Sequence, residues 1–112
     1  MNTANEARAF LDRLAATIEA RRGTDPGSSY VSSLLDGGTE KIARKVGEEA
    51  VEVVIAALRE GPQSLRNESA DLLFHLMVLW ADAGISWQDV IGELERREGV
   101  SGHEEKRSRN RQ

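Results

Sequence analysis

The chain has 112 residues, the length of one small domain, and its 4% aromatic content and 2 prolines favour helices over a β-sandwich. Its formal charge of -4 gives no electrostatic reason to expect nucleic acid or an anionic membrane as a partner. The absence of cysteine excludes disulfides, thiolate metal sites and thiol nucleophiles. Because no apolar stretch approaches a signal peptide or the roughly 18–20 residues of a membrane span, we expect a cytoplasmic protein.

The hydrophobic pattern predicts an all-α fold, with each helix ended by turn-forming residues such as Gly37-Gly38, Gly61-Pro62 and Gly84. A turn-rich loop is expected over residues 23–29. The helices are expected over about 4–22, 30–35, 40–59, 63–83 and 87–98. Lys and Arg are frequent in the last stretch, 100–112, which we expect to be a basic C-terminal arm of a single domain covering 1–112.

Two acidic clusters lie inside the otherwise apolar helices over 40–59 and 63–83. At about 100° per residue, Glu48, Glu49 and Glu52 share one face of the first, and Glu68 and Asp71 share one face of the second. The short connection between these helices predicts an antiparallel hairpin, which would place Glu52 level with Asp71 and Glu49 one turn away. Four carboxylates of these two clusters can therefore converge between the helices.

Carboxylates crowded into a partly apolar cleft cost several kcal/mol, or take up protons, unless a cation neutralises them. A divalent ion is the natural counter-charge, and all-oxygen ligands select Mg²⁺ or Mn²⁺ over zinc or copper. Such an ion completes its coordination with water and phosphate oxygens, so the substrate is expected to carry a polyphosphate. The cationic side chains suited to bind phosphate are Lys41, Lys45, Lys106 and Arg109.

Simpler interpretations exist for each of these features. The acidic faces could be the solvated sides of two amphipathic helices, and His75 is more often a hydrogen-bonded bundle histidine than a metal ligand. The apolar remainder of both helices exceeds what a small monomer can bury. This excess predicts a four-helix-type bundle around the hairpin that is completed by dimerisation.

Two stretches of the chain resemble a known family. Residues 45–52 read KVGEEAVE and residues 68–76 read ESADLLFHL, which closely resemble phosphoribosyl-ATP pyrophosphohydrolases of the histidine biosynthesis pathway. These enzymes belong to the MazG-type all-α NTP pyrophosphatases, whose shared signature is ExxE with ExxD on neighbouring helices. The similarity extends from residue 29 to the SGHEEK stretch at 101–106, about three quarters of the chain.

The resemblance implies a stand-alone, homodimeric hydrolase that converts phosphoribosyl-ATP to phosphoribosyl-AMP and pyrophosphate. Carried over position by position, the Mg²⁺ ligands would be Glu49, Glu52, Glu68 and Asp71. Glu48 would sit beside them as an outer partner or as the base that orients water. Two alternatives remain: a house-cleaning NTP pyrophosphatase of the same superfamily, and a non-catalytic helical dimerisation module.

Overall fold

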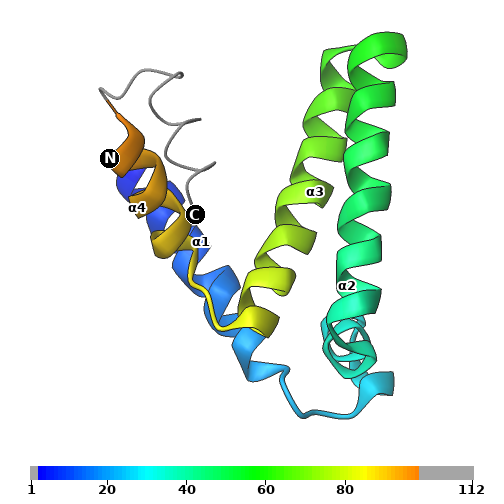
Figure 1. The fold of residues 1–112 in the computed structure, drawn as a ribbon, viewed down its shortest axis with the longest axis vertical. Helices are drawn as coiled ribbons and strands as arrows, with labels where there is room; N and C mark the ends of the chain where they lie inside the picture. Colours follow the sequence, from blue (N-terminus) through cyan, green and yellow to red (C-terminus); the bar gives the residue numbers. More distant parts are fainter. Residues whose placement is uncertain (1–2, 99–112) are drawn as a thin grey trace, which may run out of the picture.

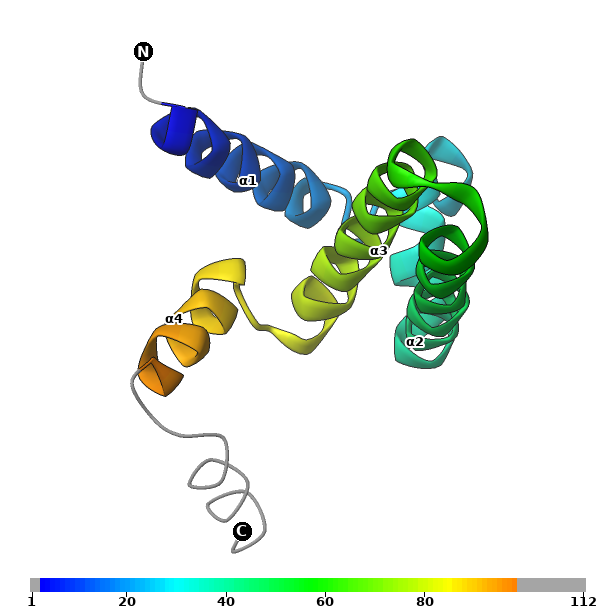
Figure 2. The ribbon, with the colours of Figure 1, turned by 90° about the horizontal axis from the view of Figure 1, so that it is seen from above.

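The computed structural model describes residues 3–98, and within that range every regular element is a helix, which confirms the predicted all-α fold. Figure 1 shows a long antiparallel hairpin of α2 and α3 on one side and α1 with α4 on the other, diverging from it. The elements in chain order are α1 (Thr3–Ala20), η1 (Pro26–Ser28), α2 (Tyr30–Ile55), η2 (Ala56–Glu60), α3 (Pro62–Ala83) and α4 (Trp87–Arg97). The view from above in Figure 2 also separates the hairpin from α1 and α4.

Helix α1 ends about two residues earlier than predicted because its last turn tightens. The N–H groups of Arg21 and Arg22 donate to carbonyls three residues back, each at 3.1 Å, instead of continuing the α-helical pattern. The expected loop follows and contains the short helix η1, whose first turn is capped by the Asp25 side chain. Ser29 then caps α2 by accepting a hydrogen bond from the Ser32 N–H at 3.0 Å.

The predicted break between the short and long helices is confirmed inside α2. Gly38 has φ 85 and ψ 178, a backbone conformation that glycine adopts without a side-chain clash. The two helical parts of α2 therefore meet at a kink. The first part, residues 30–37, lies at the base of the hairpin and does not continue the axis of the second part (Figure 1).

The tip of the hairpin differs from the prediction. The α-helix was expected to continue to about residue 59, but it ends at Ile55 and a π-helical turn occupies Ala56–Glu60. The Gly61 N–H donates to the Ala56 carbonyl five residues back, at 3.1 Å, and Gly61 has φ 126. Pro62 then opens α3, where its missing N–H costs nothing.

Local capping residues mark the end of α3 and the start of α4. Gly84 ends α3 in the left-handed region with φ 75, and the Ile85 N–H donates back to the Trp80 carbonyl at 2.8 Å. Ser86 and Asp89 form a reciprocal capping box at the start of α4. These signals place the connection between α3 and α4 at the base of the hairpin.

The core lies where α1, α2 and α3 meet. It is formed by five buried side chains, those of Ile18, Leu34, Ile42, Met77 and Val78. Both tryptophans, Trp80 and Trp87, pack against this cluster. None of the helices within residues 3–98 has the length and apolar character needed to cross a membrane.

Candidate metal centre

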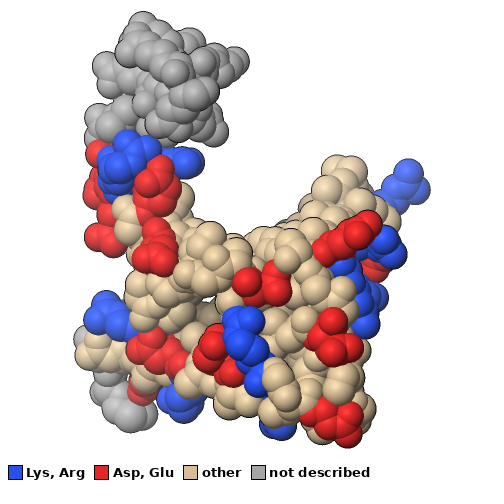
Figure 3. Space-filling model, turned by 60° about the horizontal axis from the view of Figure 1, so that its bottom comes forward, with Lys and Arg blue, Asp and Glu red and all other residues tan. Residues whose placement is uncertain are grey.

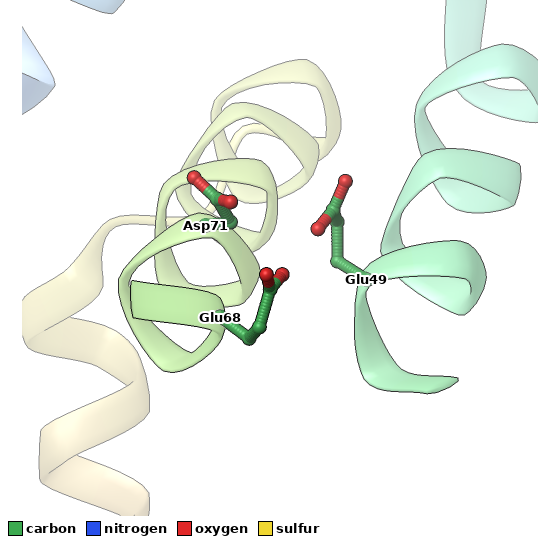
Figure 4. A group of neighbouring side chains, drawn as sticks. All are labelled: Glu49, Glu68 and Asp71. Carbon is green, nitrogen blue, oxygen red and sulfur yellow. The ribbon is translucent and has the colours of Figure 1, made fainter. Parts of the chain in front are cut away.

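Three carboxylates meet between the two helices of the hairpin. Glu49 projects from α2, and Glu68 and Asp71 project from α3, where a spacing of three residues puts them on one face. Figure 4 shows the three side chains pointing toward one another across the hairpin. One oxygen from each lies within 4.8 Å of the others, with Glu49 and Glu68 half-buried and Asp71 exposed.

The electrostatics of this group favour a bound cation. Partial burial raises the pKa of Glu68, and the nearby negative charges of Asp71, Glu52, Glu49 and Glu60 raise it further. Within residues 3–98, no lysine or arginine forms an ion pair with any of the three converging carboxylates. Their mutual repulsion is therefore left for another cation to relieve.

The donor set fits a hard divalent ion. Carboxylate oxygens are the ligands that Mg²⁺ and Mn²⁺ prefer. With Mg–O distances of about 2.1 Å in octahedral geometry, neighbouring ligand oxygens lie about 3 Å apart and opposite ones about 4.2 Å apart. Oxygens already within 4.8 Å of one another therefore need only small side-chain rotations to share one ion.

Glu52, the fourth predicted ligand, lies outside this group of three. Its side chain is exposed on α2, yet its charge is close enough to raise the pKa of Glu68. Glu60, at the end of η2, was not among the predicted site residues, and its charge also raises the pKa of Glu68. Its position just before the hairpin turn was the available signal.

The side chains of the four predicted phosphate-binding residues do not form one group in the described part of the structure. Lys45 Nζ lies 3.3 Å from Glu48 Oε2, and the hydrogen bond to Glu48 is the main cause that raises the pKa of Lys45. Lys41 instead turns toward the first part of α2, with its Nζ 3.2 Å from Ser33 Oγ. Lys106 and Arg109 lie outside the described residues.

His75 is buried one helical turn from Asp71 and makes two hydrogen bonds. Its Nδ1 lies 2.8 Å from the Asp71 carbonyl oxygen, and its Nε2 lies 2.8 Å from the Tyr30 hydroxyl. This agrees with the interpretation of His75 as a hydrogen-bonded bundle histidine. The partner Tyr30 precedes His75 by 45 residues, so local sequence patterns could not predict this hydrogen bond.

Comparison with known proteins identifies the family. The model of the family described as phosphoribosyl-ATP pyrophosphohydrolase matches residues 11–98. The chain belongs to this family. Curated relatives named phosphoribosyl-ATP pyrophosphatase include one from Azospirillum brasilense, 57% identical over 90% of this chain and 91% of its own length. Another, from Zymomonas mobilis, is 58% identical over 88% of this chain and 92% of its own length.

The family match includes every described residue of the candidate site, because it begins at residue 11 and ends at residue 98. The site is therefore part of the domain that defines phosphoribosyl-ATP pyrophosphohydrolases. On the face drawn in Figure 3, Lys and Arg are interspersed with Asp and Glu. Among the described residues drawn on that face, the two signs of charge alternate without forming one broad basic patch.

Proposed function

We propose that this chain hydrolyses phosphoribosyl-ATP to phosphoribosyl-AMP and pyrophosphate, the second step of histidine biosynthesis, with Mg²⁺ or Mn²⁺ as the cofactor. The observation that carries the proposal is the meeting of Glu49, Glu68 and Asp71 on the hairpin of a chain that belongs to this enzyme family. The same family membership supports a cytoplasmic location.

In the proposed site, Glu49, Glu68 and Asp71 hold the divalent ion, and Glu52 supplies a fourth carboxylate after a side-chain rotation. A divalent ion at this position offsets the charge that develops on the pyrophosphate leaving group. The protein's own part is to hold the substrate in line and to orient the attacking water. No covalent intermediate with the protein is needed.

Five further residues act on the substrate side of the proposed site. Glu48 lies next to Glu49 on α2 and orients the water, with its carboxylate held by Lys45. Lys45 binds a phosphate oxygen. Lys41 joins it after leaving Ser33, and the basic residues Lys106 and Arg109 add positive charge from the C-terminal arm.

A substrate panel tests the reaction. We expect kcat/KM for phosphoribosyl-ATP to exceed that for every canonical or modified NTP by at least about a hundredfold, because a site built to bind a second ribosyl phosphate leaves polar groups unpaired with a plain NTP. A higher kcat/KM for any NTP would instead favour a house-cleaning pyrophosphatase. Product analysis by chromatography separates phosphoribosyl-AMP from other cleavage products.

We also propose that the active form is a homodimer. The hairpin exposes large apolar side chains, among them Val51, Val54, Leu58 and Leu73, with Leu58 77% exposed. Apolar surface of this extent on paired helices marks an interface. Sedimentation should give twice the chain mass of 12.3 kDa, and Val54→Asp should shift it to the monomer. A monomeric wild-type protein at micromolar concentration would contradict the dimer.

A further inference from the structure

An aromatic group lies one helical turn from the carboxylate site. Phe74 and His75 follow Asp71 by three and four residues on α3, so they share its side of the helix. The ring of Tyr30, at the start of α2, stacks on Phe74 with centroids 6.3 Å apart and an interplanar angle of 19°. The same ring meets the His75 ring edge-on, at 5.7 Å and 79°. Three rings therefore stand beside the carboxylates of the proposed metal site.

The kink at Gly38 brings Tyr30 to this place. A straight α2 would separate Tyr30 from Glu49 by about 28 Å along its axis, at roughly 1.5 Å per residue. Because Gly38 breaks the axis, Tyr30 instead contacts side chains of α3 that lie one turn from Asp71. Asp71 is the residue whose carboxylate meets that of Glu49 across the hairpin. The conformation of one glycine therefore decides that this ring lies beside the site.

Two hydrogen bonds fix the position of the Tyr30 ring. The Asp71 carbonyl can only accept, so His75 Nδ1 donates to it at 2.8 Å, and in the neutral ring Nε2 accepts from the Tyr30 hydroxyl at 2.8 Å. These bonds and the imidazole ring between them put the phenol oxygen within about 8 Å of the Asp71 carbonyl oxygen. In a nucleotide only the ribose separates the base from the α-phosphate. A base that stacks on Tyr30 can therefore place its phosphates at the carboxylates.

Part of the Tyr30 ring is open to a ligand. Phe74 takes one face of the ring and His75 lies at the hydroxyl, yet Tyr30 is 49% exposed. The exposed part therefore lies on the remaining sides of the ring, which include the face opposite Phe74. An aromatic face that is held in one plane and open to solvent suits a flat ligand, because every nucleobase has a π-face that can stack on it.

The base of phosphoribosyl-ATP suits this face better than the base of ATP does. In phosphoribosyl-ATP the second ribose is attached to N1 of adenine, and a substituent at N1 makes the ring an amidine that is largely protonated at neutral pH. Unsubstituted adenine is neutral at that pH. A cation over the face of a tyrosine ring is attracted by the electrons of the ring. An open aromatic face therefore favours the N1-substituted base over the plain one.

We propose that Tyr30 is the base-binding residue of this site and that its open face stacks on the N1-substituted adenine ring of phosphoribosyl-ATP. The inference rests on the proposed function, and it names the residue that distinguishes this substrate from a plain NTP. Phe74 and His75 are positioning residues, because they hold the plane of the Tyr30 ring without contacting the base. The carboxylates bind the polyphosphate end of the same molecule through the metal.

Two substitutions of Tyr30 test this, because Tyr30→Leu removes the ring and Tyr30→Phe keeps it. We expect Tyr30→Leu to raise KM for phosphoribosyl-ATP about tenfold, the effect of one lost base stack, and Tyr30→Phe to change it less than about twofold. The matched control is Phe10→Leu, which removes a ring that is 52% exposed on α1, the helix that diverges from the hairpin (Figure 1). The control should leave KM unchanged. A Tyr30→Phe variant as impaired as Tyr30→Leu would show that the hydroxyl and not the ring face binds, and would overturn the proposal.

Binding of small probes separates base recognition from a general change in the site. By calorimetry with Mg²⁺ present, wild type should bind 1-methyl-AMP about fivefold more tightly than AMP, and Tyr30→Leu should bind the two equally. Pyrophosphate has no base, so its Kd with Mg²⁺ should be the same in wild type and Tyr30→Leu. A Kd for pyrophosphate that rises as much as the KM for phosphoribosyl-ATP would mean a structural role for Tyr30 and overturn the proposal.

The same measurements distinguish this inference from the proposed reaction. If wild type prefers 1-methyl-AMP through Tyr30 but does not cleave phosphoribosyl-ATP, the proposed reaction fails and the base-binding role stands. If wild type cleaves phosphoribosyl-ATP while Tyr30→Leu leaves KM and the probe preference unchanged, the reaction stands and the base-binding role is overturned.

Discussion

Glu68→Gln should show two separate effects of the carboxylate cluster: it lowers the melting temperature when metal is absent, and it binds the metal when Mg²⁺ is present. Without metal, the variant should melt at a higher temperature than wild type near neutral pH, because one of the charges that repel each other is gone. The raised pKa of Glu68 shows that the folded state favours the protonated carboxyl. Below the unfolded pKa of 4.5 the carboxyl is protonated in both states, and the repulsion that destabilises the fold is absent. As the pH rises through the folded pKa the carboxyl becomes charged in the folded state, so the repulsion lowers wild-type stability most near neutral pH.

Adding Mg²⁺ should reverse the order of the two proteins. At a metal concentration 100 times the dissociation constant, one site per chain stabilises the fold by about 2.7 kcal/mol. For a chain of this length that is a rise in melting temperature of about 10 °C or more. Glu68→Gln, which keeps two of the three converging carboxylates, should gain far less.

Differential scanning calorimetry in EDTA and then in Mg²⁺ measures both effects, and Glu40→Gln is the control. Glu40 is an exposed acid on α2 whose pairing with Arg44, at 3.9 Å, lies outside the cluster. It should respond to Mg²⁺ as wild type does. Equal Mg²⁺ stabilisation of wild type and Glu68→Gln would refute the ligand assignment, and no stabilisation of wild type would favour a non-catalytic dimerisation module.

Three further predictions concern single positions. Glu52→Gln should abolish turnover and leave the helical circular dichroism spectrum intact; full activity would remove Glu52 from the site. Ile42→Ala should lower the free energy of unfolding by about 2–5 kcal/mol in urea titration, because Ile42 is 0% exposed in the core, and a loss under 1 kcal/mol would contradict that packing. The Arg96 hydrogen bond lowers the pKa of Glu93 to about 2, so its stabilising effect, present above 4.5, should disappear as the pH falls from 4.5 to 2. Melting curves of Glu93→Gln should lack that part of the acid sensitivity.

Much of the fold could be predicted because its signals are local. The turn residues Gly38 and Gly84 act within a few residues, and each ends a helix where the sequence predicts. The Ser86 capping box acts over an equally short range. Helical phase likewise put Glu68 and Asp71 on one face of α3. These features need no knowledge of what packs against them.

Features that depend on the register of the hairpin or on contacts between distant residues could not be predicted from the sequence. Counting residues from Gly61 to align the two acidic clusters assumed α-helix up to the turn, whereas a π-helical turn occupies Ala56–Glu60. The bond between Tyr30 and His75 depends on the direction of the kink at Gly38, which tertiary packing sets.

The central claim is that the carboxylates of the hairpin hold a divalent ion for phosphoanhydride hydrolysis. Release of pyrophosphate from phosphoribosyl-ATP by the purified protein, with Mg²⁺ and then with excess EDTA, tests it most directly. The account predicts rapid release with Mg²⁺ that stops in EDTA and returns when Mg²⁺ is restored. Release at the same rate in EDTA, or no release with Mg²⁺, would contradict it.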